Sequence, residues 1–226
     1  ALPIYGVLVV LLVPLIFILM AKTGGGGNNA FLRAVMTSAK PFHMILATAA
    51  FMTICGSLNG TSSSAFSREG GQFWISKVIP VSARDQVKAK FMHSYAIALL
   101  GILSASFAAA FFFHARPAVL APAAALALAV AFILTAAGMI IDIARPLLDW
   151  TNPQKAIKQN MNVLLAFLAD IGIMTALGLT LNFLFKAGLD GSTILAVLFA
   201  VLAALAGAVY RILIVFAEKR YGEIEI

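Results

Sequence analysis

Residues 117–141 read PAVLAPAAALALAVAFILTAAGMII, and none of these 25 side chains is charged. A helix rises about 1.5 Å per residue and the hydrocarbon core of a bilayer is about 30 Å thick, so about 20 apolar residues can cross it. Five further stretches with at most one charged residue have a similar length. We predict six transmembrane helices, near residues 3–21, 42–65, 91–113, 118–141, 160–184 and 194–216.

The composition of the chain agrees with this prediction. Of the 226 residues, 62% are hydrophobic and only 11% are charged, whereas a typical soluble domain has about 25% charged residues. Such a chain cannot form a water-soluble surface, and its single cysteine, Cys55, excludes a disulfide scaffold. We predict an all-α, polytopic membrane protein in which residues 1–226 form a single transmembrane domain.

The basic residues predict an orientation. Of the 16 Lys and Arg residues, 11 lie in 67–90, in 142–159 and after residue 210, which alternate with the other loops. Because cytoplasmic loops carry an excess of Lys and Arg, we expect both termini to be cytoplasmic, although three basic residues in 22–40 count against this. No dense basic patch with interleaved aromatic residues occurs, so nucleic acid is not an expected partner.

The sequence lacks the motifs of a catalytic or cofactor-binding chain. No Gly-x-x-x-x-Gly-Lys-Ser/Thr sequence is present, so we expect no ATP site in this chain. The three histidines are scattered without metal-ligand spacing, and no Gly-x-Ser-x-Gly motif occurs. We predict that the chain is not an enzyme and binds no metal or cofactor.

Asp170 is the one acidic residue deep in an apolar span. An aspartate at the bilayer centre costs about 2.5–3.5 kcal/mol on insertion scales, so it should face the bundle interior or a cavity. One interpretation is a proton or substrate site. The other, which we favour here, is an ion pair with Arg211, or hydrogen bonds with Asn162 or Asn182.

The loop after the second predicted span reads SREGGQFWISKVIPVSARDQVKAK, from residue 67 to residue 90. Its centre predicts a short amphipathic helix over 73–79 that Pro80 ends. Ser82 and Asp85 have capping-box spacing and predict the start of a new helix that continues into the third span. The simplest interpretation is an interfacial helix that anchors the loop to the membrane.

The loop before the fifth predicted span reads DIARPLLDWTNPQKAIKQN, from residue 142 to residue 160. Thr151 and Gln154 have capping-box spacing, and Asn152 before Pro153 is an alternative helix start. Trp150 is expected at the level of the lipid headgroups.

At these two loops the chain resembles the membrane subunits of ABC exporters of the type-2 permease class. In the first loop the resemblance rests on Arg68-Glu69-Gly70, the helix 73–79, Pro80-Val81-Ser82 and the basic residues Lys88 and Lys90. In the second loop, Arg145-Pro146, the run from Trp150 to Gln154 and Lys158-Gln159-Asn160 look like a longer bacterial branch of the class.

The resemblance implies a permease subunit of an exporter in the bacterial cytoplasmic membrane. Its implied partners are an ATP-binding cassette subunit, which holds ATP and Mg²⁺, and a second permease half or copy. Residues 1–226 would be the C-terminal half of a larger polypeptide. Helix 73–79 would be the cytoplasmic coupling helix, and its predicted contacts with the ATPase are Phe73, Trp74, Lys77 and Pro80.

Two other functions are compatible with the same sequence. An ion- or proton-coupled secondary carrier would use Asp170 as its coupling acid and would need no ATPase. A non-transporting membrane scaffold would show neither substrate flux nor stimulation of an ATPase.

Overall fold

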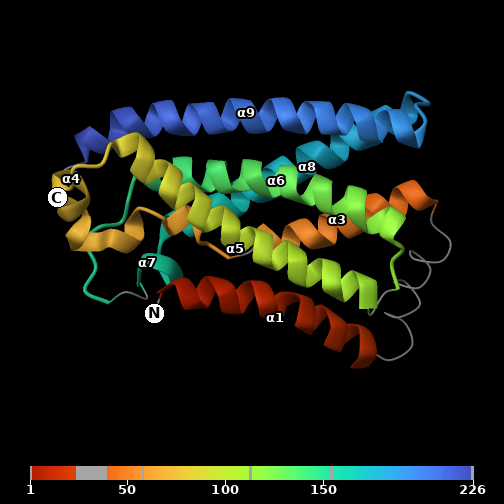
Figure 1. Cartoon of the computed structure of the whole chain (residues 1–226), viewed down its shortest axis with the longest axis horizontal. Coiled ribbons are helices and arrows are strands. Elements are labelled where there is room, and N and C mark those ends of the chain that lie inside the picture. The colour runs from red at the N-terminus through yellow and green to blue at the C-terminus, as the bar shows by residue number, and fades with distance from the viewer. Residues whose placement is uncertain (1, 24–39, 58, 112–113, 153–154, 225–226) are drawn as a thin grey trace.

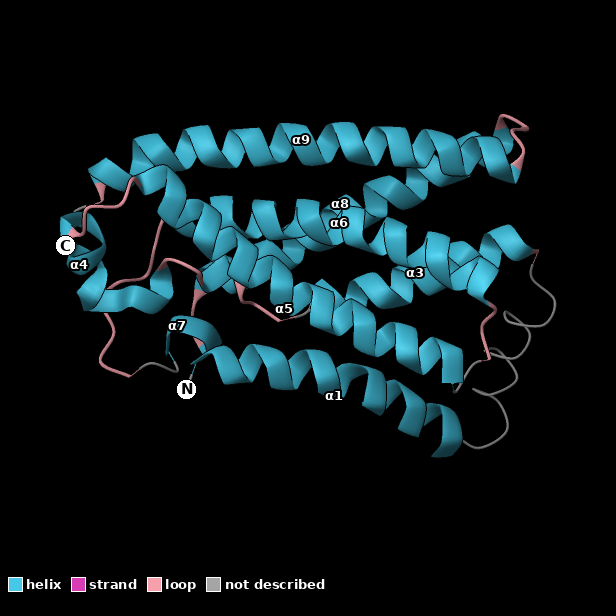
Figure 2. Cartoon of the chain, viewed as in Figure 1, coloured by secondary structure: helices cyan, strands magenta, loops and turns pink. Residues whose placement is uncertain are grey.

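A computed structural model describes residues 2–23, 40–57, 59–111, 114–152 and 155–224. Within these residues all regular secondary structure is helical (Figures 1 and 2). The long helices are α1 (Leu2–Thr23), α3 (Pro41–Ser57), α5 (Ala83–Phe111), α6 (Pro117–Ala144), α8 (Met161–Lys186) and α9 (Gly191–Glu223). The short elements are η1 (Ser62–Ser64), η2 (Ser67–Gln72), α4 (Phe73–Val78) and α7 (Lys155–Lys158).

Five segments of the described chain are long and apolar enough to cross a membrane. They support a polytopic membrane protein, because each is at least as long as the thickness of the hydrocarbon requires. The first predicted span coincides with α1, which is not among the five segments, so a sixth span stays a prediction. The five segments are Pro41–Ser64, Ala83–Phe111, Pro117–Ala144, Met161–Lys186 and Gly191–Glu223.

The second predicted span, near residues 42–65, matches the segment Pro41–Ser64, but within this segment helix α3 already ends at Ser57. The Asn59 side chain donates to the Gly56 carbonyl at 2.7 Å and accepts from the Thr61 amide at 2.8 Å, which forms a turn. An Asn-Gly pair favours such a turn even in a segment without charge. The chain therefore leaves the helix inside the bundle and continues through η1.

Helix α6 lies at the centre of the bundle and packs against α3, α5, α8 and α9, while α1 packs against α5 and α3. Helices α3 and α5 approach closely at two glycines, since a Cβ on Gly101 would lie 2.6 Å from the Cys55 carbonyl oxygen and 2.8 Å from the Gly56 Cα. Small residues allow such backbone contacts between helices in a membrane. Helix α8 is packed least tightly, with only Asn162 and Ala166 buried among its side chains.

The connections fall at the two ends of this bundle. Helix α4, helix α7 and the C-terminus lie at one end, and the connection between α8 and α9 lies at the other (Figure 1). We call the first of these the polar end; it comprises residues 59–91, 139–152 and 155–160 and the last turns of α9. It has its own apolar cluster, in which Phe66, Phe73, Phe91 and Met139 are buried.

Candidate functional site

Helix α4 lies at the polar end and matches the short helix predicted between residues 73 and 79. It runs over Phe73–Val78, and Ile79 is already extended with φ −65° and ψ 142°. This conformation is expected of a residue that precedes proline, because the ring of Pro80 disfavours a helical backbone at Ile79. Pro80 itself is exposed.

The predicted helix start at Ser82 is also confirmed. The Asp85 amide donates to Ser82 Oγ at 3.1 Å, and Ser82 Oγ donates to Asp85 Oδ2 at 2.7 Å. The first amides of a helix have no acceptor in a preceding turn. Ser82 Oγ supplies such an acceptor for the Asp85 amide. From this cap, α5 runs without a break to Phe111, so α4 and the apolar part of α5 are joined through one tight turn.

The two faces of α4 differ in burial. Phe73 is fully buried, and its ring centroid lies 5.1 Å from that of Tyr221 on α9. Phe73 is therefore not available to a partner, and its prediction as a contact residue is wrong, because it anchors α4 to the core. The opposite face forms the α4 patch, defined as the exposed residues Trp74, Ile75, Val78, Ile79 and Val81.

The residues of the α4 patch project from a short helix and from the turn that follows it. Trp74 is 53% exposed and Val78 is 73% exposed. Lys77 lies beside the patch, where its ammonium donates to the Ile224 carbonyl at the end of α9. Of the four predicted contact residues, the structure thus leaves Trp74, Lys77 and Pro80 at the surface.

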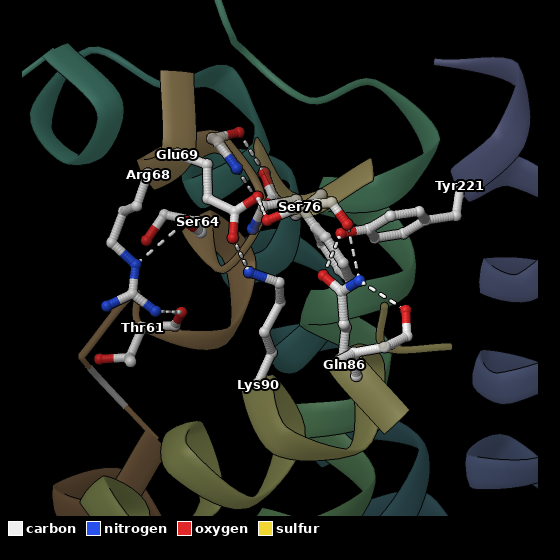
Figure 3. Close-up of polar contacts among 12 residues, drawn as sticks. Thr61, Ser64, Arg68, Glu69, Ser76, Gln86, Lys90 and Tyr221 are labelled. Carbon is white, nitrogen blue, oxygen red and sulfur yellow. Dashed lines mark hydrogen bonds and ion pairs between the residues drawn. The ribbon is translucent and has the colours of Figure 1, made fainter. Parts of the chain in front are cut away.

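A network of polar side chains holds α4 on the bundle (Figure 3). Glu69 forms an ion pair with Lys90 of α5 and accepts from Ser76 Oγ at 3.0 Å. Gln86 of α5 donates to the Ser76 carbonyl at 2.7 Å, and Tyr221 of α9 donates to Gln86 Oε1 at 2.7 Å. These contacts connect η2, α4, α5 and α9. A movement of α4 would therefore move these elements or break the contacts.

Arg68 fixes the segment before this network. Its guanidinium donates to the Ser64 carbonyl at 3.1 Å and to the Thr61 carbonyl at 3.0 Å (Figure 3). Burial lowers the pKa of the Arg68 guanidinium, and the negative charges of Asp142 and Glu69 oppose that change. An arginine side chain stays charged at neutral pH, so Arg68 keeps both hydrogen bonds to the backbone around η1.

Asp142 forms a second centre, which we call the Asp142 hub. Its carboxylate is fully buried and accepts from the Phe66 amide at 2.6 Å, the Ser67 amide at 3.0 Å and Asn162 Nδ2 at 3.0 Å. The Ser67 hydroxyl also donates to it. The hub joins α6, the start of η2 and the start of α8, and several donors stabilise the buried carboxylate.

The hub also joins the two loops that carry the family resemblance. Trp150 Nε1 donates to the Ser67 carbonyl at 2.8 Å, so Trp150 lies against η2 instead of facing the headgroups alone. Gly70 has φ +53°, and a Cβ there would lie 2.6 Å from the Trp150 ring. Only glycine combines this backbone conformation with such a close contact.

The sequence interpretation missed Asp142 as a functional residue and used it only as the end of a span. One signal could have found it: an acid at the end of a long apolar run, followed by Asn160 and Asn162 across a short loop. Asn160 is the N-cap of α8 and accepts from the Asn162 amide at 2.9 Å. The alternative starts at Thr151–Gln154 and Asn152-Pro153 include residues 153 and 154, which lie outside the described residues.

The predicted pair of Asp170 and Arg211 is not formed. Asp170 Oδ1 is buried without a hydrogen-bond partner, and Asp170 lines two cavities, one bordered by α3 and η1 and the other by α3 and α6. Arg211 is exposed on α9. The two residues have similar depth along neighbouring helices, but their helices turn them toward different surroundings. The alternative partner Asn162 donates to Asp142 instead.

No group of three His, Cys, Asp or Glu residues that could hold a metal occurs in the described part of the chain. Comparisons of the chain with protein-family models, with curated proteins and with solved structures found no match. The candidate site therefore rests on the geometry of the polar end itself.

Proposed function

We propose that this chain is a membrane-spanning permease subunit of an ATP-driven, ABC-type exporter, whose ATP is hydrolysed by a separate subunit. The observation that carries the proposal is the α4 patch. A fully desolvated aromatic anchor in an interface contributes about 2 kcal/mol or more to binding. Trp74 at 53% exposure, beside Val78 at 73%, offers such an anchor at the end of the bundle.

A coupling element has to be rigid, because a loose loop would absorb the motion of the ATPase. Two residues of α4 hold it on α9: the ring of Phe73 packs against Tyr221, and Lys77 donates to the carbonyl at the end of α9. Through the turn at Ser82 it is continuous with α5. A displacement of the α4 patch would therefore be transmitted to two long helices at once.

Two exposed ion pairs lie near the turn that joins α4 to α5 and can rearrange when a partner binds. Arg84 and Glu218 are 3.7 Å apart and Lys88 and Asp85 are 3.3 Å apart, and these four side chains are largely exposed. Exposed ion pairs of this kind contribute only about 0–1 kcal/mol, so the two basic groups can exchange partners at little cost. Charged side chains around an apolar pocket of the ATPase would then fix its orientation.

The rest of the proposal follows from the same assignment. The polar end faces the cytoplasm, ATP and Mg²⁺ are bound by the partner, and a second permease half or copy completes the translocation pathway. The membrane is the bacterial cytoplasmic membrane. The resemblance of the two loops to type-2 permeases supports this, as does their mutual packing through Ser67 and Trp150.

A proton- or ion-coupled carrier is the second candidate, and one observation favours it. Asp170 has a buried carboxylate oxygen without a partner, which is what a coupling acid requires. Such a carrier would transport substrate without ATP and would not require the α4 patch. Substrate flux in vesicles that contain this chain and no ATPase would favour the carrier.

The test is ATP hydrolysis by the complex with the ATP-binding subunit that co-purifies with the tagged chain. We expect Trp74→Ala and Lys77→Glu to lower stimulated hydrolysis at least fivefold. Phe111→Ala is the matched control, since Phe111 is 65% exposed at the other end of α5. Unchanged assembly and unchanged hydrolysis in both α4 variants would contradict the proposal.

A further inference from the structure

A groove follows the loosely packed side of α8. One cavity of about 390 Å³ lies toward the polar end, and a second of about 440 Å³ adjoins it between α3, α6 and α8. Both are lined by Ser57, Phe167 and Asp170. The second borders a third cavity of about 180 Å³ at Thr53 and Met174. The groove thus extends along much of α8.

The groove is polar where it begins. Asn59, Ser62, Ser63 and Asn160 line the first cavity. At its junction with the second cavity lie two buried oxygens without hydrogen-bond partners, Asp170 Oδ1 and Ser57 Oγ. Buried polar groups in proteins nearly always have partners, so two orphans at one place indicate that a ligand or water supplies them.

The rest of the groove is apolar. Beyond Asp170 the lining consists mainly of aliphatic and sulfur-containing side chains, such as Ile171, Met174 and Leu177. Leu181, the last groove residue on α8, lies about three helical turns or about 16 Å beyond Asp170. A linear apolar chain placed there would run parallel to α8.

The described lining of the groove has an acidic side chain and no basic one. The described residues that line the three cavities include no Lys, Arg or His. Asp170 lies nine residues after the start of α8, so about 14 Å into the membrane-spanning segment, where water does not readily compensate a carboxylate. A cation that arrives with its own apolar chain would supply the missing charge and fill the apolar part.

We propose that this groove binds a cationic amphiphile, a protonated primary amine on a linear alkyl chain, with its ammonium at Asp170 and Ser57. An ammonium has three donors, so it can bond both orphan oxygens, whereas a quaternary ammonium cannot donate to either. An anionic amphiphile would be repelled by Asp170. The site belongs to this chain alone, so its binding can be measured without the ATPase of the proposed function.

The test is equilibrium binding of radiolabelled dodecylamine to the chain in nanodiscs of neutral lipid, corrected with empty nanodiscs. We expect saturable binding that Asp170→Asn weakens at least tenfold and Ser57→Ala about threefold. Asp149→Asn is the matched control, because it removes one exposed acid away from the groove. Its affinity should equal that of the wild type.

A second variant leaves both polar groups in place. Met174→Trp would fill the groove and should also abolish binding, while the chain keeps its unfolding temperature. Dodecanol, which has the same tail without a charge, should bind at least tenfold more weakly than dodecylamine. Equal affinity for amine and alcohol, equal affinity in Asp170→Asn, or no binding above empty nanodiscs would each overturn the proposal.

Discussion

The polar end and the groove along α8 differ in whether their buried carboxylates have hydrogen-bond partners. At the polar end, the buried carboxylate of Asp142 accepts from donors at the start of η2 and on α8. In the groove, Asp170 has a carboxylate oxygen without a partner, and few side chains of α8 are buried. A saturated network is expected to be rigid and an unsaturated one to be open to a ligand.

This difference separates two tasks within one bundle. Under the proposed function, the polar end would receive a mechanical signal at the α4 patch and transmit it through α5, α6 and α9. Under the proposed binding, the groove would hold a molecule beside α8, whose main contact with the bundle is α6. Substitutions in the two regions should therefore differ in their effect on the stability of the protein.

The largest effect is expected at the Asp142 hub. Asp142→Ala removes the acceptor of the Phe66 and Ser67 amides and of Asn162, which would leave these donors buried and unpaired. Each buried donor that is left without a partner costs about 1–3 kcal/mol, so the total loss should be several kcal/mol. Reversible unfolding in mixed micelles measures the free energy. A loss below 1 kcal/mol would mean that the hub does not stabilise the polar end.

A smaller but still large effect is expected at Gly70. Gly70→Ala places a Cβ 2.6 Å from the Trp150 ring at a residue with φ +53°. Backbone strain and displacement of the ring together should cost about 2–3 kcal/mol. Gly71→Ala is the matched control, because nothing lies within 4 Å of its Cβ position. Equal stability of the two variants would show that the two loops do not depend on this contact.

The smallest effect is expected in the groove. Asp170→Asn keeps the shape of the side chain and breaks no hydrogen bond of Oδ1, so the free energy of unfolding should change by less than about 0.5 kcal/mol or rise. The same unfolding experiment on Asp142→Asn should show a loss several times larger. Equal losses for the two variants would remove the contrast between the two regions.

The sequence predicts what depends on local chemistry. Runs of apolar residues place five of the helices, and the Ser82–Asp85 spacing predicts the start of α5. The proline at 80 predicts the end of α4 to within one residue. The end of α3 at Ser57 was missed because an Asn-Gly turn carries no charge and was hidden in an uncharged stretch.

What depends on the rotation and packing of helices could not be predicted in the same way. Asp170 and Arg211 have a suitable depth for a pair, but depth does not determine which way a side chain faces. The burial of Phe73 and the exposure of its neighbour Trp74 require knowledge of the face that meets Tyr221. The Asp142 hub combines residues that lie about 75 positions apart and therefore needs the tertiary fold.

The most direct test of the proposed function is cross-linking at the α4 patch. In a Cys55→Ser background, which removes the single native cysteine, Val78→Cys and Phe111→Cys are each treated with a short thiol–amine cross-linker in the assembled complex. We predict that Val78→Cys cross-links to the ATP-binding subunit and that Phe111→Cys does not. A complex that hydrolyses ATP without any cross-link from residue 78, or with equal cross-linking from residue 111, would contradict the assignment of α4 as the coupling helix.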